Sequence, residues 1–262
     1  MITTNRIFSS LESLAKLAPD TNSVHSTFLP ALPSLNAVLA EFSPLPHAAL
    51  FLGLANDGLP ILLNLLDPLP GPILITGDAK SGKTNFIKTI ASSVSQVHSP
   101  NEVRFVVITN NLSEWRDFQR SGNCENILSV EESILTRILH SLVDWAHSNR
   151  NGQLIHLVLI DQVESLLTNP EIQQDLSWLL LRGPTRHVWP VVTVDTSHAL
   201  SNGIQPWLNS FRTRLFGYIQ NDRESQMLTG SSNASFTKLL AGVQFAMREG
   251  NAWLPFWIPK LD

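Results

Sequence analysis

The sequence predicts an α/β fold in which a mostly parallel β-sheet is flanked by helices. Three observations support this prediction. Short apolar runs rich in β-branched residues alternate with stretches of helical spacing, which implies parallel strands joined by right-handed crossovers. A glycine-rich turn, GDAKSGKT at residues 77–84, joins one such run to a helix. Hairpin signals open and close the strand-rich region, which predicts a β-hairpin at its entry and another at its C-terminal end.

The sequence predicts an N-terminal prefix at residues 1–48, with helical and proline-containing parts, followed by a main domain at residues 49–262. Residues 7–18 have helical spacing and end at a proline. The stretch 19–48 contains five prolines and few charges, so we expect an irregular connector with one short helix at 35–42.

The main domain opens with two apolar segments, 49–55 and 59–65, on either side of Asn-Asp-Gly at 56–58. Asn-Asp-Gly is a strong hairpin turn signal. The run GPILIT at 71–76 then predicts a buried central strand, and the helix after it places apolar residues at 86, 87, 90 and 91 on one face.

Further elements follow in alternation along the rest of the chain. They are a strand at 102–109, a polar loop or short helix at 112–122, an amphipathic helix at 131–147, a strand at 154–161, a helix at 170–182, a strand at 188–194, a helix near 204–209, a strand at 213–219, and a terminal strand pair at 243–248 and 252–258.

The turn GDAKSGKT has the pattern Gly-x4-Gly-Lys-Thr of a phosphate-binding loop (P-loop), and both of its flanks suit a P-loop NTPase. Backbone N–H groups of such a turn, with the positive end of the next helix, hold nucleotide phosphates. Lys83 is expected to reach the β- and γ-phosphates of ATP, and the Thr84 hydroxyl to ligate Mg²⁺. A glycine-rich turn without a ligand is the alternative. The predicted nucleotide-binding residues are Gly77, Asp78, Ala79, Lys80, Ser81, Gly82, Lys83, Thr84 and Asn85.

Asp161 closes the apolar strand LVLI, so we expect its carboxylate at the same sheet edge, beside Thr84 and the metal. An Asp that caps the next helix is the alternative. Gln162 stands where a water-activating Glu is common, and a glutamine cannot take a proton although it can orient water. Glu164 is a candidate substitute, with a solvated helix-start residue as its ordinary interpretation. We therefore expect ATP binding with slow hydrolysis, and assign Lys83, Asp161 and Gln162 to catalysis.

The composition limits the partners of the chain. Of the 262 residues 15% are charged, and the net charge is −4 with a pI near 6.0, so there is no global basic field and any DNA contact must be local. The single cysteine, Cys124, suits a reducing compartment. The N-terminus does not read as a signal peptide, and no run of about 20 apolar residues predicts a transmembrane segment. We expect a soluble, cytoplasmic protein.

These features together resemble the FtsK/HerA family of P-loop translocases, with a RecA/FtsK-like fold. The similarity covers about residues 49–262. The segments that carry it are the stretch from FLGLANDG to GDAKSGKTNFIKTIA, the strand EVRFVVIT, the segment LVLIDQVESLL, the segment RGPTRHVWPVVTVDTS, the segment FRTRLFGYIQNDRESQML and the closing hairpin LLAGVQFAMREGNAWLPFWIP.

Three departures from the family pattern concern turnover rather than fold. Gln162 replaces the usual acid, Pro184 falls where the family has an Arg, and Val-Asp at 194–195 replaces the Thr-Gln of the sensor strand. The resemblance implies a homo-oligomeric ring of six subunits in which an arginine reaches across each boundary to the γ-phosphate. The candidates are Arg182, Arg186, Arg214 and Arg223, and for each an ordinary surface or intrasubunit contact is the alternative.

The leading functional hypothesis is therefore an ATPase that moves DNA or a polypeptide through a ring. The alternative is a nucleotide-gated scaffold or regulatory subunit that hydrolyses little. A small-molecule kinase is a third, less favoured reading, because the sequence lacks an evident arginine-rich lid. The C-terminal aromatic residues Trp253, Phe256 and Trp257 are expected to pack a sheet face, with a partner surface as the alternative.

Overall fold

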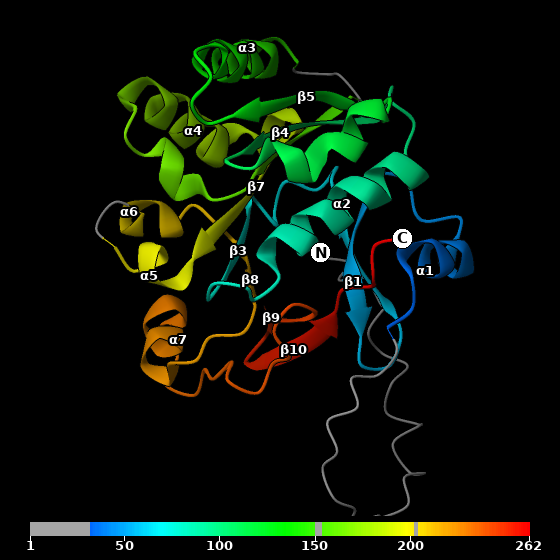
Figure 1. Cartoon of the computed structure of the whole chain (residues 1–262), viewed down its shortest axis with the longest axis vertical. Coiled ribbons are helices and arrows are strands. Elements are labelled where there is room, and N and C mark those ends of the chain that lie inside the picture. Colours follow the sequence, from blue (N-terminus) through cyan, green and yellow to red (C-terminus); the bar gives the residue numbers. More distant parts are fainter. Residues whose placement is uncertain (1–31, 150–153, 202–203) are drawn as a thin grey trace, which may run out of the picture. The chain divides into compact units, whose positions relative to one another are not determined.

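A ten-stranded sheet in the order β2-β1-β10-β9-β8-β3-β7-β6-β4-β5 forms the centre of the computed structural model (Figure 1). The structure describes residues 32–149, 154–201 and 204–262, so the helix expected at 7–18 lies outside the described residues. The strands from β8 to β5 in this order run parallel, and those from β2 to β9 are antiparallel. The mostly parallel α/β fold predicted from the sequence is confirmed.

The strands have the following bounds: β1 (Ala49–Ala55), β2 (Pro60–Asn64), β3 (Ile73–Gly77), β4 (Val103–Thr109), β5 (Cys124–Ser129), β6 (Ile155–Ile160), β7 (Val188–Asp195), β8 (Thr213–Phe216), β9 (Gln244–Glu249) and β10 (Ala252–Trp257).

The α-helices are α1 (Leu35–Phe42), α2 (Lys83–Val97), α3 (Ile134–Ser148), α4 (Pro170–Arg182), α5 (Thr196–Ala199), α6 (Gln205–Leu208) and α7 (Asp222–Thr229). The 3-10 helices of the described residues are η2 (Leu112–Arg120), η3 (Val163–Leu166) and η4 (Pro184–Arg186). None of the helices in the described residues combines the length and apolar character that a membrane span requires.

The central parallel strands β3, β7, β6 and β4 are buried on both faces, which explains their mostly apolar sequences. All six residues of β6 are buried, as are all five of β3. Alternate residues point to opposite faces: Ile73 and Ile75 join the core on one face, and Leu74 joins the core on the other.

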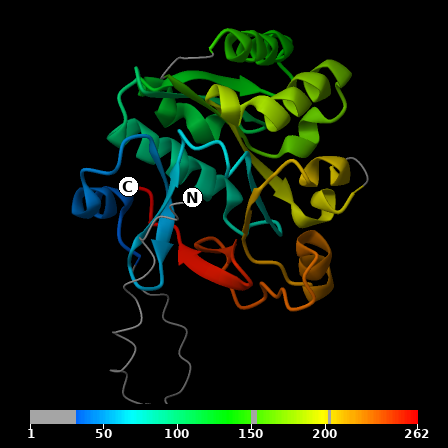
Figure 2. The same cartoon turned by 180° about the vertical axis from the view of Figure 1, so that it is seen from behind.

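Helices cover both faces of the sheet, as Figures 1 and 2 show from opposite sides. On one face, α2 packs its apolar side against β3, β4 and β7. On the other face, α3 and α4 pack against β4, β6 and β7. The helix α4 begins where its sequence predicts, because Asn169 caps it by accepting from the N–H groups of Glu171 and Ile172, and Pro170 occupies its first turn.

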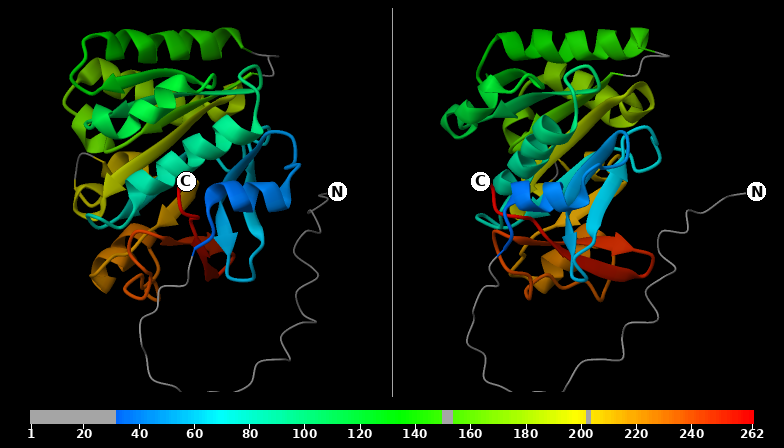
Figure 3. Two further views of the ribbon diagram at one scale, coloured as in Figure 1. Left: turned by 45° about the vertical axis from the view of Figure 1, so that its right-hand side comes forward. Right: turned by 90° about the vertical axis from the view of Figure 1, so that its right-hand side faces the viewer.

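Two hairpins extend the sheet beyond β8. The β9–β10 hairpin pairs with β8 through β9 and with β1 through β10, and the two hairpins are seen beside each other in Figure 3. Phe256 is fully buried in the core and contacts Phe86 and Phe245, while Trp253 packs edge-on against Phe216 and Phe236. The expectation that this aromatic cluster packs a sheet face is thereby met for these two residues.

The short helix expected at 35–42 is confirmed as α1. It packs against Phe51 of β1, and the N–H group of Leu35 donates to the carbonyl of Lys260 at 2.8 Å. Residues from Pro33 onward belong to the same compact unit as the sheet. The stretch 33–48 therefore packs on the main domain.

Several elements were not expected from the sequence: the strand β5, the helix α7 and the short helices α5, η3 and η4. The edge strand β5 has only one fully buried residue, Leu128, and lacks an apolar run. The helix α7 is mostly polar, but it has a cap at each end: Asn221 accepts from the N–H group of Arg223, and Gly230 takes a left-handed φ of 67°. Those two caps are the signal that could have predicted α7.

Candidate nucleotide-binding site

The turn between β3 and α2 is held in a narrow conformation by backbone contacts. Gly82, which precedes α2, has a φ of 98°, and a Cβ atom there would lie 2.6 Å from the carbonyl oxygen of Gly242. The N–H group of Gly242 in turn donates to the carbonyl of Ser81 at 3.0 Å. Only glycine fits at position 82, because any side chain would meet this second piece of backbone.

Lys83 starts α2 and lies against the turn that precedes it. Its side chain is 8% exposed. The ammonium group donates to the carbonyls of Gly77 and Asp78 at 2.9 and 2.8 Å and forms an ion pair with Asp195 at 2.6 Å. The lysine therefore holds three parts of the sheet edge together: the end of β3, the turn and the end of β7.

Thr84 and Asp161 meet although they come from different parts of the chain. The Thr84 hydroxyl donates to the Asp161 carboxylate, with oxygen distances of 3.0 and 3.2 Å. Thr193 of β7 donates to the same carboxylate at 2.8 Å, and its hydroxyl accepts from the N–H group of Gln162. The carboxyl ends of β3, β6 and β7 lie at one edge of the sheet, and this common edge brings the groups together.

The Asp161 carboxyl group is buried, with 5% of the residue exposed. Burial raises the pKa of Asp161 because it disfavours the charged form, while the hydrogen bonds from Thr193 and Thr84 oppose this shift. A buried carboxylate beside a hydroxyl is a hard oxygen donor set, the kind that suits Mg²⁺. The residues present therefore fit the predicted metal.

Gln162 is exposed at the rim of the site and has a left-handed φ of 68°. Its Oε1 accepts from the side-chain amide of Asn110 at 3.1 Å, and that amide also donates to Ser165. Neither the Gln162 amide nor the Asn110 amide accepts a proton readily. This part of the site can therefore position a water molecule but cannot deprotonate it.

Glu164, the candidate substitute for an acid at position 162, points to a different neighbourhood. Its Oε1 lies 3.2 Å from Nδ1 of His198, and its Oε2 is buried without a hydrogen-bond partner. Burial raises the pKa of Glu164, and Asp195 raises it further. These three side chains lie close enough to share a ligand, although Glu164 does not line the pocket described next.

A pocket of about 430 Å³ opens over the turn; we call it the P-loop pocket. Eight predicted site residues line it, and three further residues were not predicted from the sequence. The eight are Ala79, Lys80, Gly82, Lys83, Thr84, Asn85, Asp161 and Gln162, and the three are Glu114, Asp195 and Gly242.

The remaining predicted residues, Gly77, Asp78 and Ser81, belong to the turn but do not line the pocket. Gly77 and Ser81 are buried, and Asp78 accepts from the N–H group of Gln220 at 2.8 Å. Of the three unpredicted residues, Asp195 could have been found from the sequence, because it ends an apolar strand in the same way that Asp161 follows one. Glu114 lies in η2 and Gly242 in the turn before β9, and nothing in their own sequence marks them.

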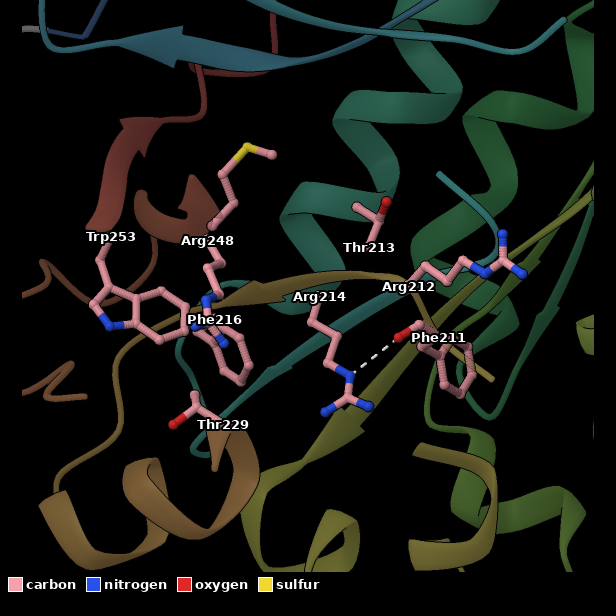
Figure 4. A pocket seen from close by; sticks show the side chains of 9 residues that line it. Phe211, Arg212, Thr213, Arg214, Phe216, Thr229, Arg248 and Trp253 are labelled. Carbon is pink, nitrogen blue, oxygen red and sulfur yellow. Dashed lines mark hydrogen bonds between the residues drawn. The ribbon is translucent and has the colours of Figure 1, made fainter. Parts of the chain in front are cut away.

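A second cavity, of about 320 Å³, lies away from the P-loop pocket and is shown in Figure 4. Three arginines and several aromatic residues line it. Arg214 donates to the carbonyls of Phe211 and Leu228 at 3.1 and 3.3 Å and to that of Leu208, and the dashed line in Figure 4 marks the first of these bonds. Burial lowers the pKa of Arg214.

The four arginines that are candidates for a contact across a subunit boundary differ in their exposure and in their contacts. Arg214 is bound to carbonyls of its own chain, which favours the intrasubunit alternative. Arg182 and Arg223 are exposed, and Arg186 is half-buried in η4. None of the four lines the P-loop pocket.

Comparison with known proteins supports the resemblance seen in the sequence. Residues 52–162 match the model of the FtsK/SpoIIIE family. EccC from Thermomonospora curvata (ATPases 2 and 3), in complex with a signal sequence peptide, is 14% identical with a TM-score of 0.71, and the match covers 94% of this chain and 46% of that one. EssC (ATPases 2 and 3) from Geobacillus thermodenitrificans is 12% identical with a TM-score of 0.68, covering 88% and 47%.

A smaller structure matches along almost its whole length. B204, the DNA-packaging ATPase from Sulfolobus Turreted Icosahedral Virus, is 12% identical with a TM-score of 0.54, and the match covers 73% of this chain and 98% of that one. This chain spans about half the length of the EccC and EssC chains. No curated protein matched the sequence.

Proposed function

We propose that this chain, a P-loop translocase ATPase of the FtsK/SpoIIIE type, binds ATP with Mg²⁺ in the P-loop pocket and couples nucleotide binding or hydrolysis to movement of DNA or a polypeptide. One observation carries the proposal. The glycine-rich turn, the ammonium group of Lys83 and the Thr84–Asp161 pair meet at one edge of the sheet and line the same pocket.

Phosphate binding rests on the start of α2. The N–H groups of the first helical turn have no carbonyl partner within the helix, so they are available to a ligand. They lie at the positive end of the helix dipole, next to the Lys83 ammonium group and the exposed Lys80. This concentration of donors suits the oxygens of a polyphosphate.

Thr84 and Asp161 are the residues that would hold the metal. Both are oxygen donors, and they already contact each other at 3.0 Å. Mg²⁺, when bound, supplies positive charge to phosphate oxygens. Thr193 donates to Oδ1 of the Asp161 carboxylate, and Thr84 lies nearer to Oδ2, so the aspartate is oriented before any ligand arrives.

The residues around the predicted water position favour slow turnover. Gln162 is held by Asn110 and cannot act as a base, and Glu164 is engaged with His198 away from the pocket lining. General-base help is worth roughly 10² to 10⁴ in rate. This arrangement gives specific support to the second candidate function, a scaffold or regulatory subunit that is gated by nucleotide and hydrolyses little.

Assembly and cargo are proposed from the relatives. We propose a homo-oligomeric ring in which a neighbouring subunit completes the nucleotide site, and a cytoplasmic location. The structural relatives include one complexed with a signal sequence peptide and one described as a DNA-packaging ATPase, so both cargo classes have support. DNA binding through phosphates must weaken with salt, with a slope of about −0.9 per neutralised phosphate. A flat salt response of cargo binding supports a polypeptide.

Phosphate release separates the motor from the scaffold. The assay compares the wild-type chain with Lys83→Ala at saturating Mg²⁺-ATP, and light scattering of the same samples reports assembly. Turnover well above that of Lys83→Ala supports the motor. Equal rates together with nucleotide-dependent assembly support the scaffold, and equal rates without nucleotide binding or assembly contradict both.

A further inference from the structure

The ion pair between Lys83 and Asp195 has no role in the proposed function. In this pair a carboxylate occupies the Lys83 ammonium group, which is expected to bind phosphate. Nζ of Lys83 lies 2.6 Å from Oδ1 of Asp195. Both residues line the P-loop pocket, and the lysine side chain is 8% exposed while the aspartate side chain is 32% exposed. Asp195 is therefore the more accessible member of the pair.

The position of Asp195 is fixed by the sheet. β7 pairs in parallel with β3, and Asp195 stands opposite Gly77, the first glycine of the turn. Asp195 is the last residue of β7, and the residues before it along that strand are buried. The register of β7 against β3 therefore places the carboxylate beside Lys83. A change of the Asp195 rotamer alone moves the carboxylate only a short distance.

The donors of Lys83 are fully used within the chain. An ammonium group has three N–H donors. The carbonyls of Gly77 and Asp78 and the carboxylate of Asp195 take these three, and Oγ of Ser81 lies a little farther away at 3.4 Å. A phosphate oxygen can reach Lys83 only by replacing one of them. The two carbonyls belong to the backbone of the turn, so the Asp195 side chain is the partner that can be displaced.

The P-loop pocket also carries more negative than positive side chains. Its lining includes two lysines and three carboxylates. Glu114 is neutralised by Lys88 at 2.7 Å, and Asp161 is the carboxylate that suits the metal. Asp195 is the remaining carboxylate, and it stands where the outermost phosphate would bind to Lys83.

We propose that Asp195 determines nucleotide specificity by occupying the γ-phosphate position on Lys83, so that the pocket favours a nucleoside diphosphate over a triphosphate. This inference rests on the proposed function. A diphosphate can bind through the free N–H groups of the first turn of α2 and leave the Lys83–Asp195 pair intact, without the contact from Lys83 to the β-phosphate that the sequence predicts. A triphosphate must displace the carboxylate and place its terminal phosphate beside a like charge, which costs affinity.

The test is the ratio of two dissociation constants, those for Mg²⁺-ATP and Mg²⁺-ADP, measured by isothermal titration calorimetry on the full chain. Asp195→Asn keeps the size of the side chain and an acceptor oxygen but removes the charge. It is expected to change the ratio by about tenfold in favour of ATP. Asp195→Ser, which also shortens the side chain, must change it in the same direction.

Glu114→Gln is the matched control, because it removes a carboxylate from the same pocket that is paired with Lys88 and not with Lys83. It is expected to shift both constants together and leave the ratio within twofold of the wild-type value. Thermal unfolding of each variant shows that the protein is folded.

Two results overturn the inference and are distinguishable from each other. A ratio within twofold of wild type in both Asp195 variants, with nucleotide binding retained, shows that Asp195 is an indifferent counterion and leaves the proposed function standing. Failure of all folded variants and of the wild type to bind either nucleotide removes the proposed function, and this inference with it.

Discussion

The hydroxyl of Thr84 donates to the carboxylate of Asp161 across 77 residues of sequence, at 3.0 Å. Thr84 lies in the first turn of the helix after β3, and Asp161 directly follows β6. The strand β7 separates β3 from β6 in the sheet, and it contributes Thr193 to the same carboxylate. The helix after β3, the end of β6 and the strand β7 thus meet at one candidate metal ligand.

Thr84→Val removes the hydroxyl and keeps the shape of the side chain. We expect it to weaken Mg²⁺-ATP binding by at least about tenfold while binding in the presence of EDTA changes little, because only the metal-dependent part is lost. Calorimetry with and without Mg²⁺ measures this. Thr89→Val is the control, since Thr89 lies in the same helix, donates to the backbone carbonyl of Asn85 and does not itself line the pocket. An unchanged Mg²⁺ dependence in Thr84→Val contradicts the assignment.

Asp161→Asn is expected to stabilise the chain in the absence of ligand. Burial raises the pKa of Asp161, so its charged form destabilises the folded state at neutral pH. Asparagine keeps an acceptor for Thr84 and Thr193 and removes the charge. The gain should be about 1 kcal/mol in the free energy of unfolding, or about 2–4 °C in Tm.

The pH dependence of this gain follows from the sign of the shift. The penalty in the wild type is present above the raised pKa of the folded state, and it disappears below the ordinary pKa of the unfolded state. The difference between Asp161→Asn and the wild type should therefore shrink as the pH falls through this window. Chemical denaturation at several pH values measures it, and a gain that grows with acidity is incompatible with a raised pKa.

Gly82→Ala is expected to destabilise the fold more than an equally strained glycine elsewhere. The φ of 98° costs an alanine about 1 kcal/mol, and its Cβ would meet the backbone of Gly242, which adds about 1–3 kcal/mol. Gly58→Ala is the matched control, since its φ is 83° and its Cβ would meet nothing within 4 Å. Urea denaturation measures the free energy of unfolding of both variants. An equal loss of this free energy in the two variants is inconsistent with close packing of the turn against Gly242.

Gln162→Glu tests whether the missing acid limits turnover. The side chain is exposed at the pocket rim, and a glutamate there keeps its acceptor role toward Asn110 while gaining a basic oxygen. We expect phosphate release to rise by about 10² in the proposed motor. Gln162→Ala is the control, and its rate of phosphate release should not exceed that of the wild type. If Gln162→Glu releases phosphate no faster than the wild type, the scaffold function is favoured.

Local signals in the sequence predicted most of the fold. The strands β3, β4, β6 and β7 are mostly apolar, and α3 and α4 have clear helical spacing, with an Asn cap before α4, so each was expected within a few residues of its observed bounds. The edge strand β5 was missed because an edge strand buries little and needs no apolar run. The polar α7 was missed because its apolar face is small, although its caps were visible.

The residues of the candidate site that are contiguous in sequence were predictable. Those that are brought together only by the register of the paired strands were less so. Lys83 and Thr84 belong to one turn, and Asp161 follows an apolar strand. The partner of Lys83, Asp195, lies 112 residues farther along and is brought to it only by the pairing of β7 with β3. Strand register depends on packing across the whole sheet, so no local pattern specifies that ion pair.

Calorimetric titration of the wild-type chain and of Lys83→Ala with Mg²⁺-ATP decides whether the P-loop pocket binds nucleotide. We expect saturable binding at one site per chain in the wild type and a loss of at least about tenfold in Lys83→Ala, because the ammonium group is the main buried positive charge of the pocket. Wild-type protein that is folded and binds no Mg²⁺-ATP, or binds it as tightly after the substitution, contradicts the account.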